Sequence, residues 1–181
     1  AERPSGSCLL NHPHRVPAFA RPPAQGTGSE QALTPPRLVM NLRSPFEQLA
    51  GCNHLARLTD KIRLHLAGQL PEDYQKPLFH ARGVDGFFMN HFGLSKEELL
   101  AAAQASNHDD AVMAAWFESR IGKDEEKKKS WNELSVNLGK PGQPMHETLA
   151  WAKKKWNFPA DGPDLGSVFK SIEWDEGRLP G

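Results

Sequence analysis

Apolar residues recur at helical spacing in the stretch "NHLARLTDKIRLHLAG", residues 53–68. An α-helix has about 3.6 residues per turn, so residues three or four positions apart share a face. The residues that share this face are Leu55, Leu58, Ile62 and Leu66. Asparagine is a favoured N-cap, and glycine commonly follows the last helical residue. The pattern therefore predicts a helix that begins at Asn53 and ends at Gly68.

Five later segments combine helical periodicity with recognisable helix ends. "SKEELLAAAQA" opens with a capping box at Ser95 and Glu98. "NHDDAVMAAWFESRIG" begins with acidic residues, which favour a helix N-terminus, and closes with glycine. Further helices are predicted in "DEEKKKSWNELSVNLG", in "PMHETLAWAKKKWNF" and in "LGSVFKSIEW", the last of these capped by Asp164.

Proline and glycine interrupt the pattern in two other places. Ser44 followed by Pro45 predicts a short helical turn over "SPFEQLA", which Gly51 closes. Residues 69–94 contain several prolines and glycines, so they are predicted to form turns, with one helical turn at "GFFMNHF". No segment requires a strand. The predicted fold class is all-α, an irregular bundle of about five to seven short helices.

Residues 1–39 lack both helical and strand periodicity. They hold 7 of the 15 prolines and too little apolar surface to offset the entropy of ordering, so they are predicted to be a disordered extension. Residues 40–181 are predicted to form a single helical domain. Met40 is a candidate natural start, in which case residues 1–39 come from an upstream frame or are not native to the protein.

The charges of the chain are balanced, with 22 Lys and Arg against 22 Asp and Glu. Nucleic acid is therefore not an expected partner, although lysine runs meet a tryptophan in "KKKSW" and "KKKW". No apolar run approaches the roughly 18 residues that span a bilayer, so no membrane association is expected. Cys8 and Cys52 cannot form a disulfide framework, which favours free thiols and a cytoplasmic protein.

Two stretches of the chain are similar to a known family. They are "LRSPFEQLAGCNHLARLTDKIRLHLAGQLPEDY" near the start and "SIEWDEGRLPG" at the close, with weaker matches in "FGLSKEELLAA" and "WNEL". On these residues the chain from about residue 42 to 181 resembles a bacterial family, the domain of unknown function numbered 5069. The resemblance implies a small domain whose two ends matter together. It brings no reaction, substrate, cofactor or catalytic residue.

One edge of the helix predicted at 53–68 is lined by nitrogen-bearing side chains, His54, Arg57, Lys61 and His65. Arg57 and Lys61 are a like-charge pair at i, i+4, which is unfavourable on a helix unless an anion lies between them. One hypothesis is a pocket in which these two cations bind an anion and His54 or His65 transfers a proton. The other is that these side chains lie at a solvated border and pack against their neighbours.

Recognised catalytic and metal-binding motifs are absent from the sequence. No His-Glu-x-x-His or Glu-x-x-His pair supplies metal ligands, so no metal site is predicted, although His80 and His91 from separate loops remain an open possibility. Cys52 is interpreted as a small buried hydrophobe rather than a reactive thiol. Tyr74, the only tyrosine, is predicted either to cover a pocket or to pack.

The chain ends with acids where a helix C-terminus disfavours them, at Asp175 and Glu176, followed by Arg178. We expect this tail to fold back so that one carboxylate lies within about 8 Å of Arg57 or Lys61, close enough for direct or water-bridged contact.

Two functions follow from these patterns. The first is a domain that binds a small anionic or polar ligand through the candidate residues Arg57, Lys61, Tyr74, Asp175, Glu176 and Arg178. Whether it is also an enzyme stays open, with His54 and His65 as candidate catalytic residues. The second is a non-enzymatic interaction or scaffold module, in which the aromatic segment 78–92 contacts a protein partner. An exposed patch of Phe87, Phe88 and Phe92 would favour the second.

Overall fold

The computed structural model describes residues 42–155, 158 and 165–179. Their elements, in chain order, are the strands β1 (Gln48–Leu49) and β2 (Cys52–Asn53) and the helices α1 (Leu55–Leu66), α2 (Glu72–Gln75), α3 (Val84–Phe92), α4 (Lys96–Ala105), α5 (Asp110–Ile121), α6 (Glu125–Ser135), α7 (His146–Lys155) and α8 (Val168–Asp175). The protein is therefore mostly helical, which confirms the predicted fold class. The predicted extension 1–39 and the predicted cap Asp164 lie outside the described residues.

The segment before α1 forms a two-stranded hairpin instead of the predicted helical turn. Gln48 pairs with Asn53 and Leu49 with Cys52 in an antiparallel ladder. Ala50 and Gly51, which join the strands, have φ of 52° and 73°. A two-residue hairpin turn with positive φ at both positions matches the twist of its strands. The prediction over "SPFEQLA" was wrong because a turn and pairing partners were both available within a few residues.

Helix α1 begins at Leu55, two residues later than predicted. Asn53 belongs to β2, and its backbone N–H donates to Asn132 Oδ1 at 2.9 Å. His54 is the N-cap, in the left-handed conformation with φ of 72°, and its side chain makes no capping bond. The predicted cap was wrong because the hairpin uses the asparagine. His54 instead turns the chain sharply from β2 into α1.

The other helix ends follow the sequence more closely. The capping box is present, since Ser95 Oγ accepts from the Glu98 N–H at 3.2 Å and the Glu98 carboxylate accepts from the Ser95 N–H. Asp109 and Asp124 cap α5 and α6. Ser167, rather than Asp164, caps α8. Helix α3 is longer than the single turn predicted, and α2 was not predicted, which brings the described helices to eight.

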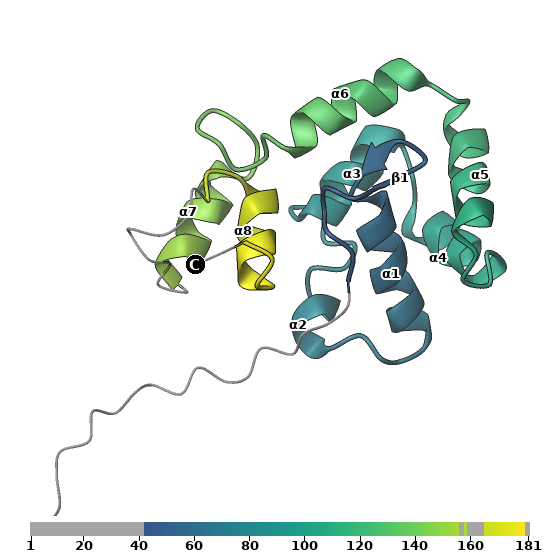
Figure 1. Ribbon diagram of the computed structural model, residues 1–181, viewed down its shortest axis with the longest axis horizontal. Coiled ribbons are helices and arrows are strands. Elements are labelled where there is room, and N and C mark those ends of the chain that lie inside the picture. The colour runs from purple at the N-terminus through teal and green to yellow at the C-terminus, as the bar shows by residue number, and fades with distance from the viewer. Residues whose placement is uncertain (1–41, 156–157, 159–164, 180–181) are drawn as a thin grey trace, which may run out of the picture. The chain divides into compact units, whose positions relative to one another are not determined.

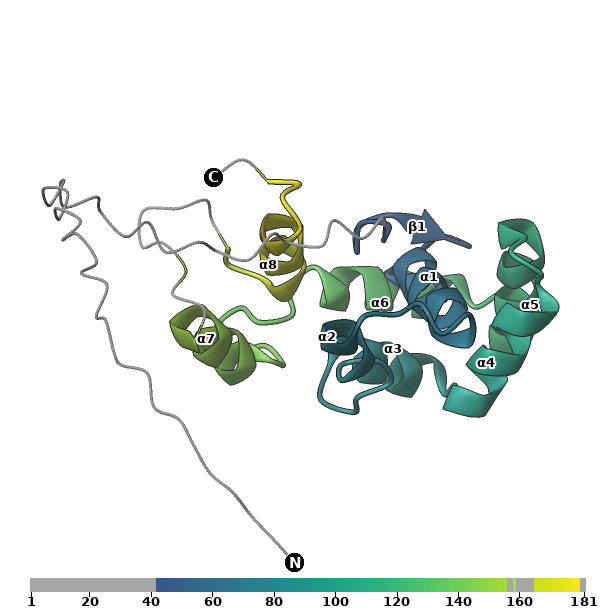
Figure 2. The ribbon, with the colours of Figure 1, turned by 90° about the horizontal axis from the view of Figure 1, so that it is seen from below.

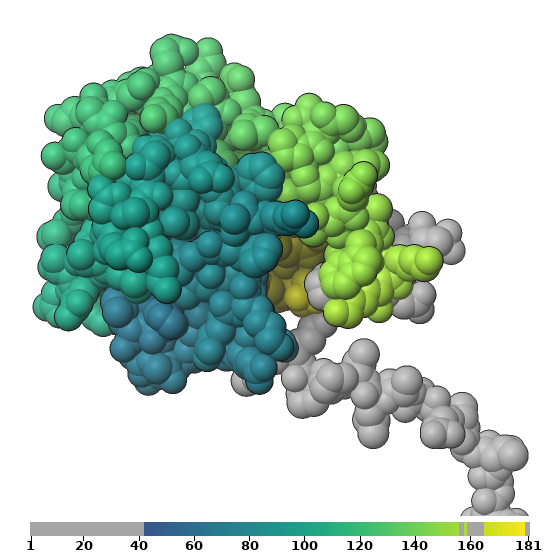
Figure 3. Space-filling view, turned by 180° about the vertical axis from the view of Figure 1, so that it is seen from behind, coloured from purple at the N-terminus to yellow at the C-terminus, as the bar shows by residue number. Residues whose placement is uncertain are grey.

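Three of the four apolar positions predicted on α1 are in the core, where Leu55, Leu58 and Ile62 are completely buried. Leu66, at the end of the helix, is 45% exposed, so the buried face of α1 ends one turn earlier than predicted. Helices α4 and α5 lie on one side of α1 and α8 lies on the other (Figures 1 and 2). Figure 3 shows part of α8 in a recess between α7 and the blue-to-teal part of the chain.

An aromatic cluster completes the core. Phe88 packs edge-on against Trp131 with ring centroids 5.2 Å apart and stacks on Phe117 at 5.8 Å. Phe88 and Phe92 are 0% and 2% exposed, and Phe87 is partly buried. The exposed aromatic patch that would have favoured an interaction module is therefore not present at these positions. The burial of these phenylalanines is difficult to predict from the sequence, because the prolines and glycines in and before α3 obscure its helical periodicity.

The lysine runs are part of ordinary amphipathic helices where the structure describes them. Trp131 is buried, and its indole N–H donates to Asn53 O at 2.9 Å. Lys128 is tied to Glu118 at 3.3 Å and to Glu125 at 2.9 Å. Trp156 of the second run lies outside the described residues. None of the helices in the described part of the chain has the length and apolar character needed to cross a membrane.

Candidate functional site

The structure contains the basic edge predicted on α1 over the first two turns of the helix. His54, Arg57 and Lys61 are 1%, 3% and 5% exposed. They lie at i, i+3 and i+7, so the helix repeat brings them to one strip facing the rest of the domain. His65 is exposed on the last turn and is not among the contacts of this strip. The structure therefore brings together three of the four predicted nitrogen-bearing residues.

Lys61 and His54 converge on one buried carboxylate, Asp85 of α3. Lys61 Nζ donates to both oxygens of Asp85, at 2.5 and 2.6 Å. His54 Nε2 lies 2.7 Å from Asp85 Oδ1, and the Phe79 backbone N–H donates to Oδ2 at 3.2 Å. Asp85 is 1% exposed, so a charged group is buried here only because four donor contacts surround it.

The protonation states follow from these contacts. Burial lowers the pKa of His54 to about 4, against the opposing effect of Asp85, so the imidazole is neutral at pH 7. Burial would raise the pKa of Asp85, but Lys61 and His54 outweigh it and hold the pKa well below its ordinary value. Burial also lowers the pKa of Lys61. Since ionised Asp85 can only accept, His54 donates from Nε2 and carries its lone pair on Nδ1, which has no hydrogen-bond partner.

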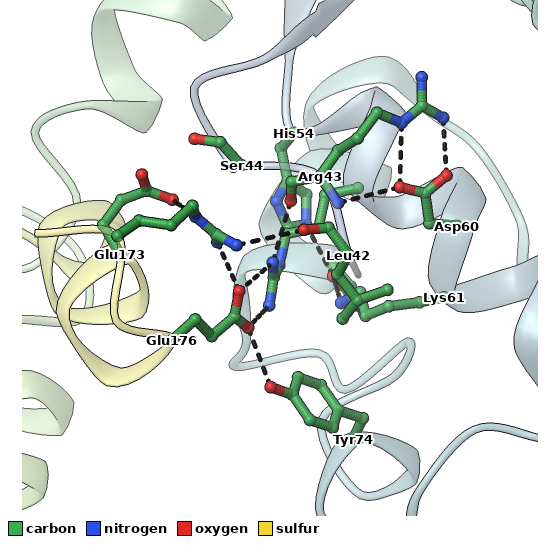
Figure 4. Close-up of polar contacts among 12 residues, drawn as sticks. Leu42, Arg43, Ser44, His54, Asp60, Lys61, Tyr74, Glu173 and Glu176 are labelled. Carbon is green, nitrogen blue, oxygen red and sulfur yellow. Dashed lines mark hydrogen bonds and ion pairs between the residues drawn. The ribbon is translucent and has the colours of Figure 1, made fainter. Parts of the chain in front are cut away.

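The C-terminal tail folds back onto this edge, as predicted. Arg57 Nη1 donates to Glu176 Oε2 at 2.9 Å, and Arg57 Nη2 donates to Oε1. The Tyr74 hydroxyl donates to the same Oε1 at 2.9 Å, as Figure 4 shows. Arg178 Nη2 adds a further contact to Oε2. Glu176 is therefore a carboxylate of the tail that meets the basic edge.

Electrostatics favour an ionised Glu176. Burial would raise its pKa, but the hydrogen bond and charge of Arg57, with the bond from Tyr74, hold it below the ordinary value. The pKa of Tyr74 rises to about 12, first because the phenol is half-buried and then because Glu176 is beside it. Tyr74 therefore stays protonated and acts as a donor. The Arg57 and Tyr74 side chains together hold one carboxylate, that of Glu176.

A second ion-pair network holds the back of α1. Arg43 Nη2 bonds to Asp60 Oδ1 at 2.7 Å, and Arg43 Nη1 bonds to Asp110 Oδ2 at 2.6 Å. Arg63 Nη1 reaches Asp110 Oδ1 at 2.7 Å. Asp60 and Arg63 therefore have structural partners in this network. This network joins the chain before β1 to α1 and to the start of α5.

Sequence reasoning missed two of the acids that define the site's surroundings. Asp85 lies in "GVDGFF", where an acid inside an apolar run was the available signal for a buried charge. Asp110 was interpreted as a residue that favours the start of α5, and its role as a partner of two arginines needs the tertiary fold. Neither pairing could be found from spacing, because each joins separate elements.

Other candidate features lie elsewhere. A cleft of about 320 Å³ is lined by the end of α1 and the turn from α4 to α5, including Arg63, Gln104 and His108, and not by the Arg57 strip. Cys52 is completely buried, and burial raises the pKa of its thiol to about 12, as expected of an inert core residue. Among the described residues, no three His, Cys, Asp or Glu side chains are grouped as a metal site would need.

Comparison with known proteins places the chain in a family without assigning it an activity. No curated protein matches it. The profile of one family, described as "Domain of unknown function (DUF5069)", matches residues 39–178. The matched range contains the Arg57 strip, Tyr74, Asp85 and the tail carboxylate Glu176. The chain therefore belongs to the DUF5069 family.

Proposed function

We propose that this domain binds a small molecule carrying one carboxylate through Arg57 and Tyr74, and that Glu176 occupies the same position until the ligand displaces it. The observation that carries the proposal is the convergence of two arginines and a phenol on a single carboxylate. Paired N–H donors on one guanidinium match the two oxygens of a carboxylate, a geometry used widely to recognise such groups.

A ligand carboxylate can replace Glu176 beside Arg57, whereas Asp85 beside Lys61 cannot be replaced in the same way. Asp85, which holds Lys61, lies inside helix α3 and also accepts from His54 and from backbone, so moving it would disturb the core. Glu176 follows the last residue of α8, and Gly177 has φ of 74°. Tyr74 belongs to α2, a helix of four residues, none of them buried. The surroundings of Arg57 can therefore rearrange with little loss of packing.

Replacing Glu176 with a ligand carboxylate costs far less free energy than removing Glu176 and leaving Arg57 without a partner. Leaving a buried charge without its partner costs about 3–5 kcal/mol. A ligand carboxylate that replaces Glu176 keeps Arg57 paired, so most of that loss is avoided. When the tail that carries Asp175, Glu176 and Arg178 moves away, Arg57 stays on α1, and Lys61 stays paired with Asp85. Arg57 is then the cation left to pair with a ligand, and its single charge suits one carboxylate rather than a multiply charged anion.

A binding role fits the geometry better than catalysis. His54 is 1% exposed, and its Nε2 is already bonded to Asp85, so this candidate base faces no open cavity. His65 is exposed but separate from the Arg57 position. The alternative of an interaction module loses its specific support, because Phe88 and Phe92 belong to the core. The free buried thiol of Cys52 supports a reducing, cytoplasmic setting for this function.

The test is chemical rescue. Glu176→Ala removes the carboxylate of a side chain that, counted from Cβ outward, propionate matches in size and charge. We expect propionate to raise the thermal midpoint of this variant more than sodium chloride does at equal concentration, because binding to the native state stabilises it. Glu173→Ala is the matched control, since Glu173 lies on the same helix and pairs with Arg178 but not with Arg57. It should respond equally to both salts.

A second measurement uses the unchanged protein. In a ¹H–¹⁵N titration, propionate should shift the resonances of Arg57 and of residues 173–178 and leave those of Arg63 unchanged. Absence of rescue in Glu176→Ala, together with no shift in the wild type, would overturn the proposal. Equal rescue of both alanine variants would show a general salt effect and would also overturn it.

A further inference from the structure

The two arginines that hold Glu176 also hold the backbone at residues 42 and 43. Arg57 Nη1, which donates to Glu176, also donates to the Arg43 carbonyl at 3.0 Å. Arg178 Nη1 donates to the Leu42 carbonyl at 3.2 Å, while its Nη2 contacts Glu176. One carboxylate thus orients two guanidinium groups, each of which also donates to a backbone carbonyl oxygen (Figure 4).

Leu42 and Arg43 have different additional contacts. The Leu42 side chain is 3% exposed, and its carbonyl is bonded by Arg178. Arg43 is held independently of the tail, because its backbone N–H donates to Asp60 at 3.1 Å and its Nε donates to the same oxygen at 2.9 Å. Loss of the tail contacts should therefore loosen Leu42 and leave the Arg43 side chain in place.

We propose that occupancy of the Arg57 position by a ligand is coupled to the hold on Leu42. The coupling rests on the proposed function, since it requires a carboxylate that displaces Glu176. Arg178 is only two residues from Glu176 and follows Gly177, so a tail that swings out carries Arg178 with it and breaks the bond to Leu42. The ligand keeps Arg57 paired and so preserves the bond to the Arg43 carbonyl.

The consequence is a defined change at the start of the helical domain. With Glu176 bound, the C-terminal turn fastens residues 42 and 43 to α1. With a ligand bound, residue 42 loses one charge-assisted hydrogen bond and residue 43 loses none. Ligand occupancy at Arg57 is therefore expected to change how firmly the Leu42 carbonyl is held, while the buried Leu42 side chain and the Arg43 contacts stay in place.

Amide hydrogen exchange of the full chain tests this coupling without a ligand. Arg178→Gln removes the donor to Leu42 and leaves the bond between Arg57 and Glu176. The Arg43 N–H belongs to the same peptide group as the Leu42 carbonyl, so losing the bond from Arg178 makes that peptide group easier to open even though Asp60 still accepts from the N–H. We expect exchange of the Arg43 amide to become about tenfold faster, the change that corresponds to losing one hydrogen bond to a charged group. Arg120→Gln is the matched control, because Arg120 also bridges a carboxylate and a carbonyl, those of Glu98 and Gly93, at a distant surface.

The second arm adds propionate to the wild type, which should accelerate exchange of the same amide and have no further effect in Arg178→Gln. If propionate shifts Arg57 resonances but leaves exchange at residue 43 unchanged, the coupling is overturned and the proposed function stands. If Arg178→Gln accelerates exchange while propionate does not bind, the proposed function fails and the fastening role of Arg178 remains. Exchange in Arg178→Gln within twofold of that in Arg120→Gln would overturn the coupling directly.

Discussion

Arg57 and Glu176 are 119 positions apart and form a two-point ion pair in which the side chains are only 4% and 9% exposed. The pair explains why the like-charged Arg57 and Lys61 can lie one turn apart on α1. Each has its own carboxylate, Glu176 for Arg57 and Asp85 for Lys61. The acidic residue at the C-terminus of α8 is explained by the same contact, because a favourable partner offsets the unfavourable helix dipole.

Replacing Glu176 with glutamine should destabilise the domain by about 3 kcal/mol, because Arg57 would stay buried without a compensating charge. Glu173→Gln should cost less, about 1 kcal/mol, since its partner Arg178 is partly exposed and keeps Glu176 as a second partner. Urea unfolding at pH 7.5 measures both free energies. Equal losses in the two variants would show that Glu176 has no special role in holding the tail.

The Lys61 and Asp85 pair should behave as a coupled unit. Lys61→Met and Asp85→Asn should each lower the free energy of unfolding by about 3 kcal/mol or more, because each leaves the other group buried and unpaired. The double variant should lose clearly less than the sum of the two single losses. A double-mutant cycle in urea provides the comparison. Additive losses would mean that the two groups do not interact, contrary to the 2.5 and 2.6 Å contacts.

Acid should weaken the domain through His54. Its ordinary pKa is 6.5 and its folded-state pKa is about 4, so between these values the unfolded chain binds a proton that the folded chain does not. Stability should therefore fall as the pH drops from 6.5 towards 4, by about 3 kcal/mol at the limit, at about 1.4 kcal/mol per pH unit. Asp85, whose pKa is also lowered, adds its loss only below its ordinary value of 3.8.

Urea midpoints between pH 7.5 and pH 4.5 measure this dependence. His54→Gln should flatten the slope, because glutamine cannot take up the proton. His65→Gln is the control, since His65 is exposed on the same helix, and it should keep the slope of the wild type. A slope that survives in His54→Gln and disappears in His65→Gln would contradict the assignment.

Gly86 of α3 should not tolerate alanine. A Cβ there would lie 2.4 Å from the His80 carbonyl oxygen and 2.5 Å from Ala81 Cα, and both are backbone atoms that cannot rotate away. Alanine normally favours a helix by about 1 kcal/mol over glycine, but overpacking costs typically 1–3 kcal/mol or more, so we expect a net loss. Gly83→Ala, with its closest contact at 3.3 Å, should lose less. The thermal midpoints of the two variants measure this difference. A Gly86→Ala variant more stable than the wild type would show that residues 80–81 can move.

The sequence located the helices better than it located the turns between them. The box at Ser95 and Glu98 and the cap at Asp109 involve residues close in the chain, so local chemistry is enough to place them. The hairpin at residues 48–53 and helix α2 were not predicted, and α3 was predicted only as a single turn. Ser44, Pro45 and Gly51 suit a helical turn as well as a hairpin, and the choice depends on β2 packing against α6.

For the candidate site too, the sequence determined some features and the tertiary structure decided the others. The sequence by itself determined that Arg57 and Lys61 share one strip of α1, because the helical repeat fixes that geometry, and the misplaced acids at 175 and 176 indicated that the tail needed a cation. Only the tertiary structure decided which carboxylate meets which cation, that Asp85 lies between Lys61 and His54, and that Arg178 reaches Leu42. Those contacts join residues from separate helices, and their pairing depends on burial and packing of the whole domain rather than on any local spacing.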